Sequence, residues 1–187
     1  MELSYSNYKL KISRGNGILY KLRNFVSKQI LRTLFYSFIQ PYIDYGLLNW
    51  ASAPKSYLDP IRNNLRKVIR TMSFKDKYDS TKELFEDFNI LEFDENYIYR
   101  LGIFMYKLSN NQLPIGINNM FKKLSNQRYN VTSGYLLPSV RTNYGKRFIT
   151  FKGISTWKNI PVEIKDKGTL GLFKKYYKKF LTEKQQN

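Results

Sequence analysis

The chain has 187 residues and a formal charge of +18, with 32 Lys and Arg against 14 Asp and Glu, and it contains neither histidine nor cysteine. These absences exclude an imidazole base, a thiolate nucleophile and a zinc knuckle. The basic excess favours a polyanionic partner, because Lys and Arg that neutralise phosphates release bound counterions. With 42% hydrophobic residues, the chain is expected to fold around a packed core.

The basic charge is distributed unevenly. Residues 122–187 carry fifteen Lys and Arg against three acids, whereas residues 1–121 carry seventeen against eleven. Eight acids form what we call the acidic island, residues 76–95: Asp76, Asp79, Glu83, Glu86, Asp87, Glu92, Asp94 and Glu95. No stretch approaches the ~20 apolar residues of a membrane span, and the first residues lack the apolar segment of a secretory signal.

The N-terminal part predicts two successive helices. Apolar residues and tyrosines recur at steps of three and four over residues 5–22, which indicates a helix in which Gly15 lets a neighbouring element approach closely. Ser27 is expected to cap a second helix, which Pro41 must kink or end because proline supplies no amide to the preceding turn.

A third helix is predicted to start at Asp59, a capping residue followed by Pro60 at the first helical position. Basic residues recur along one side of this helix: Arg62, Arg66 and Arg70, with Lys67 beside them. With no acid to pair them, the arginines repel one another, and phosphates lying across the face would relieve the repulsion. The alternative is a solvated face without a partner. The charge of the whole chain favours phosphate contacts.

Further helices are expected over residues 83–88 and 95–109, capped by Thr81 and Asp94. The second of these is apolar on most sides, which predicts a central helix. A short helix should follow over residues 118–124.

The C-terminal region is expected to be mixed. Over residues 125–161 the content of Gly, Pro and Thr rises and helical periodicity fades, which predicts loops with one or two short strands, one of them over residues 148–152. Thr169 should cap a final helix. The expected fold is mainly α, with a helical region over residues 1–110 and a basic region with short strands over residues 111–187 that ends in an amphipathic helix.

Two further groups of basic residues are candidates for phosphate contact. Arg141, Lys146 and Arg147 lie in a segment rich in Thr, Asn and Gly whose amides and hydroxyl would suit a phosphate. The final helix carries four lysines, Lys174, Lys175, Lys178 and Lys179. A basic amphipathic helix can bind nucleic acid, a partner protein or a membrane surface, and its aromatic residues can equally dock it on the core.

The carboxylates predict no metal site and no catalytic site. Tyr42-Ile43-Asp44-Tyr45 superficially resembles the aromatic-x-Asp-Asp box in which polymerases hold two metal ions, but a tyrosine replaces the second aspartate. No phosphate-binding Gly-rich loop, serine nucleophile elbow or dinucleotide fingerprint is present.

Trp157 is expected to be a structural anchor, because apolar residues recur on both sides of it in the sequence. The alternative is a platform on which bases stack, which requires an exposed ring beside basic residues. Lys158 is such a neighbour.

Short blocks of residues, spread in order over nearly the whole chain, carry a family resemblance. They are Gly17–Arg23, Leu34–Gly46, Asn49-Trp50, Tyr57-Leu58, Lys67–Arg70, Leu137-Pro138, Arg141–Asn143, Gly145-Lys146, Gly153, Trp157, Ile160-Pro161, Phe173–Lys175 and Phe180-Leu181. In this order they resemble the segment that follows the catalytic palm in reverse transcriptases of non-LTR (LINE-type) retrotransposons, especially jockey-like ones. The chain departs from the family at Tyr129–Thr132, where Tyr-Asn-Thr-Arg is frequent, and at Lys158, which separates Trp157 from Asn159.

The resemblance implies a thumb-like helical bundle followed by the basic C-terminal region of an RNA-directed DNA polymerase. Fingers, palm, catalytic aspartates and endonuclease lie upstream in the family, so this part holds no catalytic residue and no cofactor, although the parent polymerase would use Mg²⁺. The implied partners are RNA, an RNA–DNA hybrid or target DNA, together with the upstream palm and fingers. The implied location is intracellular, in the nucleus or the cytoplasm.

From these observations we expect a non-catalytic nucleic-acid-binding fragment that grips RNA or an RNA–DNA template–primer. The alternative from another class is a free-standing basic adaptor that binds a protein partner through the acidic island. A membrane-surface protein led by the final helix is a third reading, disfavoured because the basic charge is spread over several segments.

Overall fold

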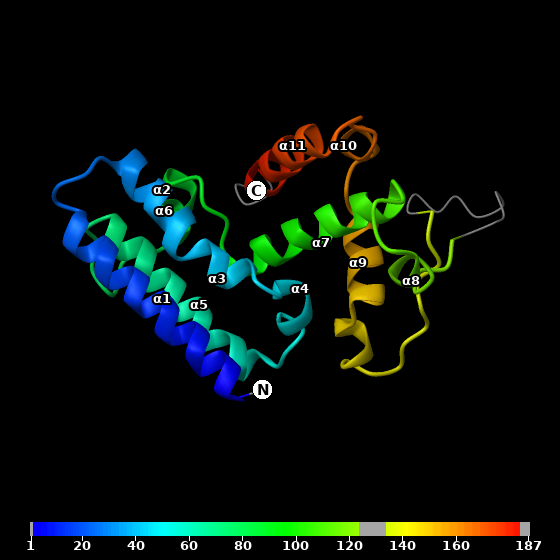
Figure 1. Cartoon of the computed structure of the whole chain (residues 1–187), viewed down its shortest axis with the longest axis horizontal. Coiled ribbons are helices and arrows are strands. Elements are labelled where there is room, and N and C mark those ends of the chain that lie inside the picture. The colour runs from blue at the N-terminus through cyan, green and yellow to red at the C-terminus, as the bar shows by residue number, and fades with distance from the viewer. Residues whose placement is uncertain (1, 124–133, 184–187) are drawn as a thin grey trace. The chain divides into compact units, whose positions relative to one another are not determined.

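The computed structural model describes the backbone of residues 2–123 and 134–183, and side chains from residue 8 onward (Figure 1). The described chain is mainly α-helical, as predicted. Its described residues contain no strand, and their one isolated β-bridge joins Lys123 and Tyr135. The chain divides into two compact units, residues 1–94 (unit 1) and 95–187 (unit 2).

Unit 1 is a group of helices built around one long parallel pair. Its elements are α1 (Glu2–Leu22), α2 (Lys28–Phe38), α3 (Gln40–Asp44), α4 (Leu47–Trp50), α5 (Lys55–Met72), α6 (Lys82–Asp87) and the first two residues of α7 (Phe93–Ser109). Helices α1 and α5 lie side by side and run in the same direction (Figure 1). The Asn64 amide of α5 donates to the carbonyl oxygen of Lys9, and Arg23, just after α1, donates to the carbonyl oxygen of Thr71.

Gly15 allows the close approach predicted for it. A Cβ atom at this position would lie 2.8 Å from Cγ1 of Ile39 and 3.3 Å from the carbonyl oxygen of Phe38. The chain after α2 therefore packs directly against the backbone of α1. The hydroxyl of Ser27 accepts a hydrogen bond from the amide of Ile30, so the predicted cap of α2 is confirmed.

The predicted start of the third helix at Asp59 is wrong. Helix α5 begins at Lys55, after Pro54, whose carbonyl accepts from the amide of Tyr57. Pro60 lies inside the helix, where it is exposed and supplies no amide. The Asp59 carboxylate pairs with Arg62 instead of capping the helix.

The two other helices predicted to start in unit 1 are present, but their predicted side-chain caps are wrong. Thr81 precedes α6 and its carbonyl accepts from the amide of Phe85, but its hydroxyl makes no capping hydrogen bond. Helix α7 begins at Phe93, so Asp94 is its second residue rather than its cap.

Three helices of the described chain end in a left-handed residue. Phe74 (φ 55°), Asn89 (φ 51°) and Asn111 (φ 53°) follow α5, α6 and α7. At each end the next amide returns to a carbonyl of the last turn, as when Lys75 donates to Arg70 over 3.0 Å. Glycine and asparagine adopt this conformation readily, whereas a bulky phenylalanine there is strained.

Unit 2 is built around α7. Besides the rest of α7 it contains α8 (Ile115–Asn118), the 3₁₀ turn η1 (Gly145–Arg147), α9 (Ile149–Lys158), α10 (Val162–Lys165) and α11 (Leu170–Glu183). Glycines allow α9 and α11 to approach α7 closely. A Cβ at Gly153 would lie 3.0 Å from the sulfur of Met105, and one at Gly102 would lie 2.2 Å from Cε1 of Tyr177.

Two predictions for this region are wrong. Residues 148–152 were expected to form a strand, but α9 begins at Ile149, because Gly153, Ile154 and Trp157 bury one helical face. This packing overrides the strand preference of the local sequence. A short helix was expected over residues 118–124, but the structure has α8 at Ile115–Asn118, directly after Pro114. By contrast, Thr169 caps α11 as predicted: its hydroxyl accepts from the amide of Leu172 over 3.3 Å.

Candidate nucleic-acid interface

The basic residues of α5 do not form one uniform face. Arg62 is only 16% exposed and donates to three carboxylate oxygens: to Asp59 over 2.8 Å and to Asp94 over 2.5 and 2.9 Å. The hydrogen bond to Asp94 raises the pKa of Arg62, outweighing the opposite effect of burial. The expectation that no acid pairs these arginines is therefore wrong for Arg62, which joins α5 to the start of α7.

Arg70 is also partly engaged. It is half-buried, and its Nε donates to the carbonyl oxygen of Asp79 over 2.9 Å. Arg66 and Lys67 are exposed and make no ion pair with a described residue. Neighbouring residues of an α-helix point about 100° apart, so these two cations point in different directions from α5. Lys67 lies on the side of Thr71, toward the end of α1.

The basic segment before α9 offers side-chain charge rather than free amides. The Thr142 hydroxyl accepts from the amide of Gly145, and the Thr142 carbonyl accepts from the amide of Lys146. The backbone amide of Arg147 donates to the backbone carbonyl of Tyr144. These three amides have acceptors within the segment, so Gly145 and Lys146 do not offer the free amides that the predicted phosphate loop requires of them. The side chains of Arg141 and Lys146 are exposed.

Helix α11 presents its lysines in two adjacent rows. Lys174 and Lys178 are four residues apart along one flank, and Lys175 and Lys179 along the outer face. Lys179 lies 3.5 Å from Glu183, and both side chains are largely exposed. The opposite face docks the helix on the core.

That docking face is formed by Phe173, Tyr177 and Leu181, all buried. The Phe173 ring stacks on Tyr106 with centroids 4.5 Å apart and lies 6.0 Å from Trp157. Trp157 is 4% exposed, so its predicted burial is confirmed.

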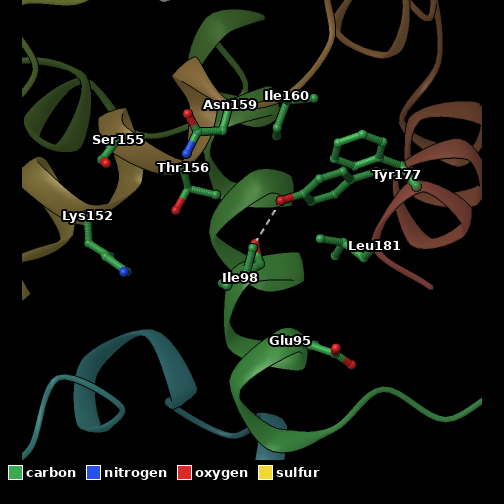
Figure 2. Close-up of a pocket in the computed structure, with 10 residues that line it drawn as sticks. Glu95, Ile98, Lys152, Ser155, Thr156, Asn159, Ile160, Tyr177 and Leu181 are labelled. Atoms are coloured by element: carbon green, nitrogen blue, oxygen red, sulfur yellow. Dashed lines mark hydrogen bonds between the residues drawn. The ribbon is translucent and has the colours of Figure 1, made fainter. Parts of the chain in front are cut away.

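A cavity of about 360 Å³ lies in unit 2 between α7, α9 and α11. Figure 2 shows its polar wall, with Lys152 and Ser155 from α9 and Asn159 directly after it, and its more apolar wall from α11, with Tyr177 and Leu181. The Tyr177 hydroxyl donates to the backbone carbonyl of Ile98 over 3.2 Å, drawn as a dashed line in Figure 2. Burial strongly raises the pKa of Tyr177. The cavity can bind a small group by hydrogen bonds and apolar contact, but it offers no activated nucleophile or carboxylate pair.

The acidic island is partly engaged within unit 1. Asp87 forms an ion pair with Lys28, and Asp94 binds Arg62. The Asp79 carboxylate accepts from the amide of Asp76. These contacts leave the island less free for an outside partner than its charge suggests.

The aspartate of the polymerase-like tetrapeptide, Asp44, is the last residue of α3. Its carboxylate accepts a hydrogen bond from the side-chain amide of Gln40 over 2.9 Å. Across the described ranges, no three acidic, histidine or cysteine side chains gather as metal ligands would. No described helix combines the length and the apolar character of a membrane span. Residues 129–132, where the sequence differs from the pattern of the family it resembles, lie outside the described residues.

The structure also reveals a basic residue that the sequence analysis did not single out as a site. Arg23 lies over two rings, with its guanidinium carbon 4.5 Å from the centroid of Tyr20 and 4.7 Å from that of Phe74. Tyr20 and Arg23 are three residues apart, a spacing that predicts contact on a helix. Nothing in the sequence indicated that Phe74 joins them.

Comparison of the chain with protein-family models, with curated proteins and with solved structures finds no match. The functional assignment therefore depends on the geometry of the described residues and on the block resemblance.

Proposed function

We propose that this chain binds the phosphate backbone of RNA or of an RNA–DNA template–primer, as the non-catalytic C-terminal part of a non-LTR retrotransposon reverse transcriptase. One observation carries the binding proposal: exposed cations without an acidic partner among the described residues recur on α5, before α9 and on α11. They include Arg66, Lys67, Arg141, Lys146 and Lys175.

The charge balance supports a polyanionic partner over a protein docked on the acidic island. Ion pairs join Asp87 to Lys28, Asp59 and Asp94 to Arg62, and Glu183 to Lys179. Because 32 Lys and Arg stand against 14 Asp and Glu, more than half of the basic side chains cannot have an acidic partner of their own, and like charges repel one another. Phosphates relieve that repulsion, whereas the island's Asp87 and Asp94 already have partners.

The assignment to a reverse transcriptase is supported by the blocks that resemble the family. In that setting the chain holds the nucleic acid, and the palm performs the chemistry with its metal ions. The chain alone is expected to extend no primer.

A salt-titrated binding assay tests the proposal with three probes: an RNA–DNA hybrid, duplex DNA and anionic lipid vesicles. Wild-type protein should bind the nucleic acids with a steep dependence on salt concentration. The double variant Arg66→Gln/Lys67→Gln should reduce the slope of log K against log salt by about one to two, because each phosphate contact contributes about 0.7–0.9.

Arg62→Gln on the same helix is the matched control. It should leave the slope nearly unchanged and lower the melting temperature, because it removes the contacts with Asp59 and Asp94. If the folded double variant had an unchanged slope, Arg66 and Lys67 would be solvated residues that make no phosphate contact. Tighter binding to vesicles than to either nucleic acid would favour a membrane surface and overturn the proposal.

A further inference from the structure

Two aromatic rings beside Arg23 remain largely open to water. Tyr20 is 59% exposed and Phe74 is 57% exposed, although each contacts the guanidinium on one side. A flat ring has two faces, and more than half of the surface of each of these two residues is uncovered. Arg23 is held in place by its own donation to the carbonyl oxygen of Thr71 over 3.1 Å.

The backbone at Phe74 adds a second, independent observation. Phe74 adopts the left-handed conformation at the end of α5, where α6 and α7 use Asn89 and Asn111. Asparagine adopts this conformation readily and phenylalanine only under strain, so the local backbone alone would favour a different residue. Backbone strain of this kind persists where the side chain has a use.

One use is internal: the ring fastens the end of α5 to Arg23 at the end of α1. That contact occupies one face of the ring and leaves the exposed face unexplained. Exposed aromatic rings beside cations are the surfaces on which proteins stack the bases of single-stranded nucleic acids. Arg23 is such a cation, and Lys67, which has no acidic partner among the described residues, lies one turn before Thr71, to which Arg23 donates.

We propose that Tyr20, Arg23 and Phe74 form a platform on which unpaired bases of a single-stranded RNA or DNA stack. This inference rests on the proposed nucleic-acid binding and specifies its substrate class: a strand with unstacked bases, bound partly through base rings and not only through phosphates. The guanidinium orders both rings, and their outer faces receive the bases.

The test compares an oligothymidylate with an abasic deoxyribose-phosphate oligomer of the same length, with an oligouridylate as the RNA arm. The two DNA probes carry the same phosphates, so their affinity ratio isolates base stacking. Wild-type protein should prefer the oligothymidylate by about five- to hundred-fold, the range expected for the loss of one stacked base.

Phe74→Asn should lower this ratio several-fold while the salt slope stays unchanged, because the variant removes one of the two rings and no charge. It should remain folded, since asparagine suits the backbone of Phe74 as it does at Asn89 and Asn111. Tyr20→Leu should have the same effect. Phe74→Tyr and Tyr20→Phe, which keep the rings, should retain the preference.

The outcomes separate this inference from the proposed function. Equal binding of the two DNA probes by wild-type protein overturns the platform and leaves phosphate binding intact. If both folded variants, Phe74→Asn and Tyr20→Leu, kept the wild-type affinity ratio, the bases would contact another part of the protein. This result would likewise overturn the platform. Absence of binding to every probe overturns both proposals.

Discussion

Two arginines one turn apart on α5 have different roles because of their partners. Arg62 is enclosed by the carboxylates of Asp59 and Asp94 and is 16% exposed, whereas Arg66 points into water. Removing Arg62 would leave two carboxylates without their cation, so its loss is expected to affect folding. Removing Arg66 leaves no described group without a partner, so its loss is expected to affect binding alone.

At the same scale, Trp157→Ala should lower the free energy of unfolding by about 3–5 kcal/mol, because it removes a buried indole from its contact with Phe173. Urea unfolding followed by circular dichroism measures the loss. Trp157→Phe is the control and should keep a larger share of the stability. If Trp157→Phe melted normally but bound single strands much more weakly, Trp157 would be a stacking residue after all.

The residue scale also shows what could be read from the sequence. Gly15, Ser27 and Thr169 were predicted in their roles because each acts on its own helix or the next. The Asp59–Arg62 pair was open to prediction from its three-residue spacing, but Asp59 was interpreted as a cap. The third partner, Asp94, lies far along the chain, and no local pattern indicates such a contact.

At the scale of the element, helices α9 and α11 depend on glycines where they meet α7. Fading helical periodicity and a rising content of Gly, Pro and Thr misled the prediction at Ile149, because the local sequence does not reveal that Gly153 faces Met105. Periodicity was sufficient for α1, α2 and α11, whose buried faces repeat over several turns. The basic clusters were visible in the sequence, whereas the commitment of the amides around Thr142 required the backbone geometry.

Gly102→Ala tests this packing. The added methyl group would lie 2.2 Å from Cε1 of Tyr177, so the buried Tyr177 ring or the helix that carries it must shift, and the variant should lose about 1–3 kcal/mol of unfolding free energy. Gly171→Ala is the matched control on α11, because a Cβ there meets nothing within 4 Å. It should gain up to about 1 kcal/mol from higher helix propensity. Equal melting temperatures for the two variants would contradict the close approach of α11 to α7.

At the scale of the whole molecule, the charge should be nearly constant around neutral pH. The chain has no histidine or cysteine, and its carboxyl, phenol and amine side chains ordinarily titrate near 4 or near 10. Binding to nucleic acid at fixed salt should therefore change little between about pH 6 and pH 9. A large change in affinity within this window would point to a titrating group that the side-chain composition does not supply.

Stability should fall at alkaline pH. Burial raises the pKa of Tyr36, Tyr97, Tyr135 and Tyr177, so the folded protein holds these protons more tightly than the unfolded chain. Their contribution is complete below the usual tyrosine pKa of about 10 and is lost as the pH rises further. Lys165, whose pKa burial lowers, acts in the opposite direction. Urea unfolding across this range should show the fall, and Tyr177→Phe should reduce it; a flat profile would contradict the prediction.

Each compact unit contains one of the chain's two tryptophans, so the intrinsic fluorescence of each indole reports on one unit. Trp50 is partly exposed, donates its indole N–H to the carbonyl of Tyr45 and stacks on Tyr8, whereas Trp157 is buried beside Phe173. Emission from the buried indole should lie at shorter wavelength than emission from Trp50. Replacing either indole with phenylalanine leaves a single fluorophore, so the denaturation of each unit can be followed without any label.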